Sequence, residues 1–179
     1  MKPSFTLVLA FVILLAGLLS AQRRRDPLTP VEVDQLREAM LEPQERLKLL
    51  VDFARVRLGS LEQVRRDPKT KDRGGKTHDL MSDFLAVYDE LNDNIDMYVD
   101  RKDDIRKPLK LIIEADTEFQ SRVRAIKDAA DVPPDEKKEY EFMITNTLET
   151  LEAGAQDHRQ LMVEQEAAAK NKKKKKSSD

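Results

Sequence analysis

Five aspartates recur along one stretch of the chain at the spacing of a helix. They follow one another at intervals of four, three, four and three residues: Asp89, Asp93, Asp96, Asp100 and Asp103. An α-helix turns once every 3.6 residues, so these carboxylates are predicted to share one face, opposite the apolar side of the helix. Such a face could bind a cationic partner or a divalent metal. It could also be the solvated side of a bundle, which we favour, although like charges one turn apart repel.

Lysines dominate the last ten residues, KNKKKKKSSD. The candidate contacts with an anionic surface are Lys172, Lys173, Lys174, Lys175 and Lys176. Three interpretations are a solvated end without a partner, attachment to anionic lipid head groups or envelope polymers, and binding of nucleic acid. No aromatic residue interleaves the lysines, which argues against nucleic acid, because base stacking would need one. Residues 170–179 are expected to be a disordered tail, because they have no large apolar side chain to bury.

The sequence carries no pattern typical of an enzyme, a cofactor site or a metal site. It has no Cys, which excludes disulfides, thiolate metal sites and a Cys nucleophile. The GKT at 75–77 has Thr70 where a phosphate-binding loop needs Gly, so it is interpreted as a turn before a helix cap. His78 and Ser82 are interpreted as surface residues at a helix start. His158 lies in an apolar stripe, where a ligand, a pH-sensitive residue and a partly buried structural histidine are all options.

The first 21 residues are typical of a secretory signal peptide. Lys2 precedes an apolar run over residues 5–19, and small residues at 20 and 21 suit a cleavage site. Residues 22–29 then form a basic lead-in. Three arginines at 23–25 oppose translocation, so the alternative is an inner-membrane anchor through residues 5–21. We expect export, to the periplasm or the exterior.

From Thr29 onward, apolar residues return every three to four positions, which predicts amphipathic helices. Pro and Gly residues separate a short helix before Pro43 from four longer ones. The first of the longer helices is expected to begin at Pro43, and the second to span about 77–103. The third is expected to begin at the Asp103–Asp104 pair, and the last to run from about Pro134 to Lys170. Tyr88 and Tyr98 are expected at the edge of the core with solvated hydroxyls. Because the breaks are short, residues 30–169 are predicted to form an all-α, antiparallel four-helix-type bundle, with a short extra N-terminal helix and a long C-terminal helix.

Composition points to an interaction protein with a thin aliphatic core. Of 179 residues, 37% are charged and 5% are aromatic. The net charge of −2 hides an acidic helical body, which carries −10 once the basic ends are set aside. The sequence therefore predicts an exported, non-enzymatic scaffold or adaptor of the bacterial cell envelope, whose partner is a protein, an anionic envelope surface or a second copy through the last helix. Alternatives are an ATP-independent periplasmic chaperone or stress protein, and, third, an enzyme with an unrecognised site.

Overall fold

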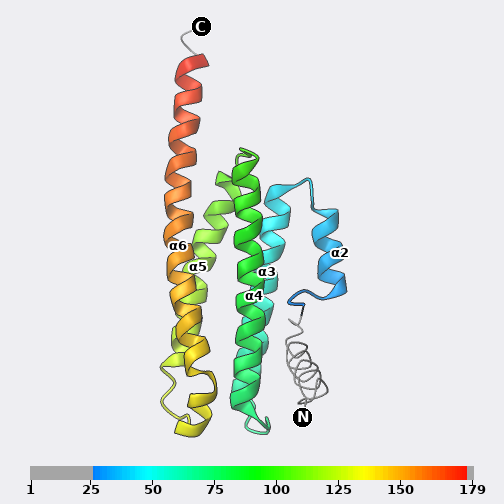
Figure 1. Ribbon diagram of the computed structural model, residues 1–179, viewed down its shortest axis with the longest axis vertical. Helices are drawn as coiled ribbons and strands as arrows, with labels where there is room; N and C mark the ends of the chain where they lie inside the picture. The colour runs from blue at the N-terminus through cyan, green and yellow to red at the C-terminus, as the bar shows by residue number, and fades with distance from the viewer. Residues whose placement is uncertain (1–25, 177–179) are drawn as a thin grey trace, which may run out of the picture.

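The computed structural model describes residues 26–176, which are helical without any strand in that range (Figure 1). The helices are α2 (Pro30–Glu38), α3 (Pro43–Arg66), α4 (Arg73–Asp100), α5 (Arg106–Lys127) and α6 (Pro134–Lys176). The predicted all-α class is confirmed. The signal peptide and residues 22–25 of the basic lead-in lie outside the described residues. Among the residues described, none of the helices has the length and apolar character that crossing a membrane requires.

Helices α3 to α6 form a four-helix bundle whose successive members run antiparallel (Figure 1). Helix α3 packs against α4 and α5, and α6 packs against the same two helices. The diagonal pairs are therefore α3 with α6 and α4 with α5. As a result, the neighbours α3 and α5 run parallel, as do α4 and α6, and the turn from α4 to α5 crosses the diagonal.

A capping box begins α2 and also fixes it to the bundle. The Thr29 side chain accepts from the Glu32 N–H, and the Glu32 carboxylate accepts from the Thr29 N–H at 2.7 Å. The same carboxylate pairs with Arg57 of α3 at 2.6 Å. Burial alone would raise the pKa of Glu32, but the hydrogen bonds from Arg57 and Thr29 and the charge of Arg57 together lower it. The short extra helix is thus held against α3 by a charge pair.

Several helix boundaries differ from the prediction. Helix α4 begins at Arg73, earlier than the predicted Thr77, because the Asp72 side chain accepts from the Gly75 N–H and caps the helix. The Thr77 hydroxyl instead donates to the Arg73 carbonyl at 2.7 Å. The last helix, α6, continues to Lys176, past the predicted helix end at about Lys170. Lysine is a good helix former, and its positive charge is favourable near a helix C-terminus.

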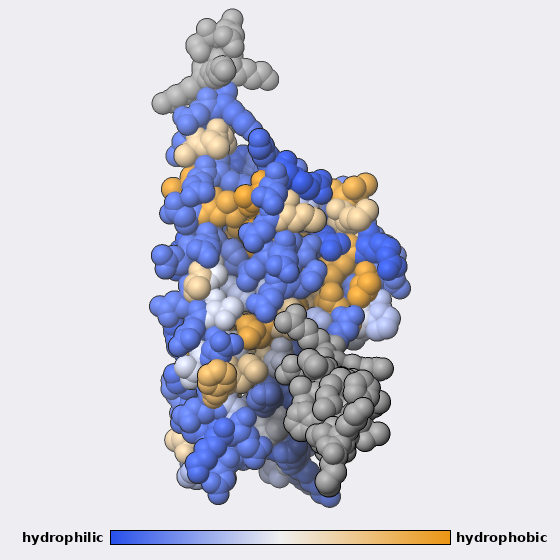
Figure 2. Space-filling view, in the orientation of Figure 1, coloured by the Kyte–Doolittle hydropathy of each residue, from blue (hydrophilic) through white to orange (hydrophobic). Residues whose placement is uncertain are grey.

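The apolar stripes pack as the periodicity predicts. In α6, the inner stripe is buried over six residues that follow one another at intervals of three or four: Tyr140, Ile144, Thr147, Leu151, Ala155 and His158. Phe84 and Phe119 meet edge to face with ring centroids 5.3 Å apart. The face shown in Figure 2 is largely hydrophilic, with apolar patches over α2 and between α6 and the C-terminal end of α4. The core is therefore a narrow aliphatic and aromatic seam inside a charged shell.

Candidate functional site

The predicted acidic face exists over four of its five residues. Asp89, Asp93, Asp96 and Asp100 are exposed on α4. Asp103 lies beyond the helix end, in the turn where Lys102 has a φ of 63°, and its carboxylate is 3.2 Å from Arg101 Nε. The helical phase is lost there, so Asp103 does not continue the row. Across residues 26–176, no group of three or more His, Asp or Glu side chains is arranged to hold a metal.

One part of the acidic face borders a groove between α4 and α6. The groove has a volume of about 400 Å³, and its polar lining includes Asn92, Asp96, Asp157 and His158. These helices run parallel, and their packing places the carboxylates of Asp96 and Asp157 on the same groove. The carboxylates give it a negative rim, while the histidine reaches it from the interior.

His158 belongs to a buried polar network that joins three helices. Its Nδ1 lies 2.9 Å from Asp116 Oδ2 of α5, and its Nε2 lies 3.1 Å from Asn92 Oδ1 of α4. The Tyr88 hydroxyl donates to Asp116 Oδ1 at 2.8 Å, across the diagonal of the bundle. Asp116 and Tyr88 are fully buried, and His158 is 3% exposed. The interpretation of His158 as a structural histidine at a helix seam fits this arrangement best, since its hydrogen-bonding groups face protein partners.

The two tyrosines were wrongly placed at the edge of the core. Burial, followed by the negative charge of Asp116, raises the pKa of Tyr88, so its hydroxyl stays a hydrogen-bond donor. The Tyr98 hydroxyl is also buried, and it has no hydrogen-bond partner within the described chain. Tyr88 approaches α6 closely at Gly154, where a Cβ atom would overlap the tyrosine hydroxyl. Glycine at this position therefore makes room for the network.

A hydroxyl beside the network is hydrogen-bonded within its own helix. Thr150 supplies a hydroxyl to the groove beside His158, but that hydroxyl donates to the Asn146 carbonyl of its own helix at 3.0 Å. His78 is exposed, and its ring nitrogen lies 3.4 Å from the neighbouring Asp79 carboxylate. The Thr150 hydroxyl therefore has its partner within α6, and His78 lies at the surface, as predicted.

The lysine-rich end of α6 extends past the rest of the bundle (Figure 1). Gln165 is level with the α4–α5 turn, because its amide donates to the Asp103 carbonyl and accepts from the Ile105 N–H. Residues 166–176 continue the helix for about 16 Å beyond that point. Lys170 and Lys172 are exposed, and the side chains after Lys172 lie outside those that the structure describes.

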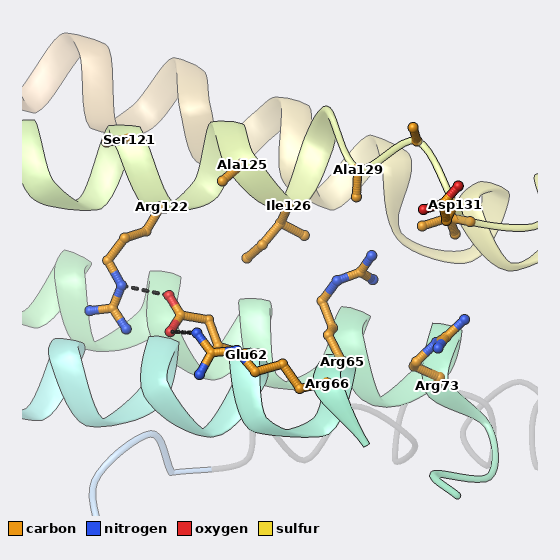
Figure 3. A pocket seen from close by; sticks show the side chains of 12 residues that line it. Glu62, Arg65, Arg66, Arg73, Ser121, Arg122, Ala125, Ile126, Ala129 and Asp131 are labelled. Atoms are coloured by element: carbon orange, nitrogen blue, oxygen red, sulfur yellow. Dashed lines mark hydrogen bonds and ion pairs between the residues drawn. The ribbon is translucent and has the colours of Figure 1, made fainter. Parts of the chain in front are cut away.

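The structure also shows an arginine-lined pocket that the sequence analysis missed (Figure 3). It lies where the C-terminal ends of α3 and α5 meet the start of α4, and its volume is about 650 Å³. Four guanidinium groups line it, those of Arg65, Arg66, Arg73 and Arg122. They come from three helices and share no spacing along the chain, so only the helix packing brings them together.

No protein-family model, curated protein or solved structure matches this chain.

Proposed function

We propose that the protein is an exported, non-enzymatic scaffold or adaptor of the bacterial cell envelope that acts by surface interaction, with the basic end of α6 as its contact. The observation that carries this proposal is the continuation of α6 past the α4–α5 turn into its lysine run. This end combines positive charge with a position at the edge of the bundle, where Lys172 still lines a pocket with Asp104 and Arg106.

Charge separation gives the projecting helix a physical role. The lysines after residue 169 would be attracted to an anionic surface by about 1 kcal/mol each when close to it. The helical body, with its charge of −10, would be repelled by the same surface. Contact at the tip of α6 would therefore orient the bundle away from the surface and leave its sides accessible to a partner.

Sedimentation with lipid vesicles tests this proposal. We expect the protein to sediment with vesicles rich in anionic phosphatidylglycerol but not with neutral phosphatidylcholine vesicles, and we expect high salt to weaken the binding by screening. A chain that ends at Ala169 should stay in the supernatant. Equal binding by the shortened chain would contradict the proposal. Near-stoichiometric suppression of the aggregation of an unfolded client, without vesicle binding, would favour the chaperone alternative.

Location and assembly need their own measurements. N-terminal sequencing of the protein from its native host should find Gln22 first if the signal peptide is removed. An intact Met1 in the membrane fraction would instead support the anchor through residues 5–21. Light scattering of the full protein tests a homodimer through the last helix, since such a dimer should have twice the monomer mass.

A further inference from the structure

The arginine-lined pocket has two chemically different walls. Its charged wall comes from the last turn of α3 and the first residue of α4, together with Arg122 of α5 (Figure 3). Its apolar wall comes from the last turns of α5 and the segment that follows: Ala125, Ile126, Ala129, Ala130 and Val132. The volume of about 650 Å³ lies in the range of small-molecule sites. A ligand that fits both walls carries a charged group and an apolar group.

The guanidinium groups of the pocket differ in how fully protein acceptors occupy them. Arg122 Nε lies 2.7 Å from Glu62, and its Nη1 lies 3.1 Å from Glu118. Arg73 makes two hydrogen bonds to Glu136, at 2.9 and 2.7 Å. The hydrogen bond from Arg73 and the charges of the two nearby arginines hold the pKa of Glu136 below its usual range. These pairs form a charged frame that fixes the shape of the pocket.

Arg65 is the least exposed of the four arginines, and its contacts with protein acceptors are long. Its side chain is 12% exposed, yet its distance to Glu136 is 3.8 Å, and within the described chain its one hydrogen bond is a 3.4 Å contact with the Thr77 hydroxyl. Its guanidinium lies over the Tyr140 ring at 5.1 Å, which fixes its plane. A guanidinium has five N–H donors, so Arg65 keeps donors that can take further acceptors, and none of its nitrogen atoms is fully buried without a partner. An oxygen-rich anion in the pocket would supply those acceptors.

We propose that this pocket binds a small organic anion, whose carboxylate or phosphate group accepts hydrogen bonds from Arg65 while its apolar part lies against Ala125, Ile126 and Ala129. The planar fork of a guanidinium matches the paired oxygens of either group. The exposed Asp131 on the rim opposes the anion and limits its affinity. This site is independent of the lysine-rich end of α6.

Titration of the full chain with defined probes tests the proposal. The probes are octanoate and octyl phosphate, with octanol as the neutral control, and binding is followed by calorimetry and by backbone amide shifts. We expect saturable binding of at least one anion at millimolar concentration or below, with shifts centred on residues 121–132. Binding of octanoate alone identifies a carboxylate ligand, and binding of octyl phosphate alone identifies a phosphate ester. Failure of both anions to bind, or equal binding of octanol, overturns the proposal.

Variants locate the site. Arg65→Gln should weaken binding by about tenfold or more, because a hydrogen bond to a charged group is lost. Ala125→Glu places a competing carboxylate at an exposed helical position and should abolish binding while the circular dichroism and the melting temperature are kept. Asp131→Asn should tighten binding several-fold. Arg124→Gln is the matched control, since Arg124 is exposed on α5, does not line the pocket, and contacts Gln120.

Ala125→Glu keeps the test decisive even if the other variant does not fold. If Arg65→Gln unfolds the protein, Ala125→Glu alone decides, because its side chain is solvent-facing. Affinity in Ala125→Glu equal to that of the unmodified protein would place any binding elsewhere and overturn the proposal.

Discussion

Asp116 of α5 and His158 of α6 form a hydrogen bond of 2.9 Å in the interior of the bundle, 42 positions apart in the chain. Tyr88 extends the pair to α4, so one buried group of polar atoms fixes three helices relative to one another. Taking a carboxylate out of water is costly, and its partners offset that cost only while they are all present. Removing one member of this group should therefore lower the free energy of unfolding more than replacing all of its members with apolar side chains.

Substitution of His158 tests this expectation. His158→Leu leaves the Asp116 carboxylate buried with one partner fewer and should lower the free energy of unfolding by about 3–5 kcal/mol. The triple variant Tyr88→Phe, Asp116→Leu, His158→Leu removes the charge as well, so it should be more stable than His158→Leu alone. Urea unfolding of each variant measures the difference. His78→Leu, at an exposed histidine, should change stability by less than about 0.5 kcal/mol. Equal effects at the two histidines would refute a stabilising network.

Gly59 and Gly154, which lie in the interiors of two helices, predict opposite outcomes for the same substitution. Gly59 in α3 has open space around it, its nearest neighbour being Arg122 Nη2 at 4.0 Å. Gly59→Ala should therefore stabilise the protein by up to about 1 kcal/mol through helix propensity. Gly154→Ala should destabilise it, because the added Cβ would overlap the Tyr88 hydroxyl. The effect of Gly154→Ala should shrink in a Tyr88→Phe background. Thermal unfolding that shows equal stabilisation by both alanines would contradict the close packing of Tyr88 on α6.

Glu136 should make a pH-dependent contribution to stability. The hydrogen bond from Arg73 lowers the pKa of Glu136 in the folded protein, so its contribution is complete above the ordinary glutamate pKa of about 4.3 and is lost as the pH falls through the lowered value. Glu136→Gln should thus cost about 1–2 kcal/mol at neutral pH, and this difference should narrow below about pH 4.

Urea unfolding across the pH range checks this behaviour. Glu141→Gln, at an exposed position on the same helix, is the control and should follow the unmodified protein throughout. If the difference in free energy of unfolding between Glu136→Gln and the unmodified protein stays constant down to pH 2, the charge of Glu136 is not involved.

The helices were predictable because their apolar side chains repeat with the period of a helix. The buried stripe of α6, from Tyr140 to His158, follows directly from that period. The start of α4 could not be predicted from the apolar pattern. Its cap, Asp72, has a left-handed backbone with a φ of 52°, which that pattern does not reveal. The predicted end of α6 came too early, because the prediction rested on the lack of apolar side chains to bury and not on the helix propensity of lysine.

The buried network carried a signal in the sequence that went unused. Asp116 lies four residues after Ile112 and three before Phe119, in phase with the apolar stripe of α5. His158 lies in phase with the stripe of α6. Polar residues in phase on two predicted neighbours are candidates for a buried pair. The arginine pocket had no such signal, because the distance from Arg65 to Arg122 depends on the packing of α3 against α5.

The surface-interaction account depends most directly on the charge of the α6 end. The decisive measurement compares vesicle binding by two fivefold variants of Lys172 to Lys176, one with arginine and one with glutamine at every position. Both residues are good helix formers, so the helix is kept while the charge differs. The arginine variant should bind phosphatidylglycerol vesicles like the unmodified protein, while the glutamine variant should not. Binding that survives in the glutamine variant would contradict it.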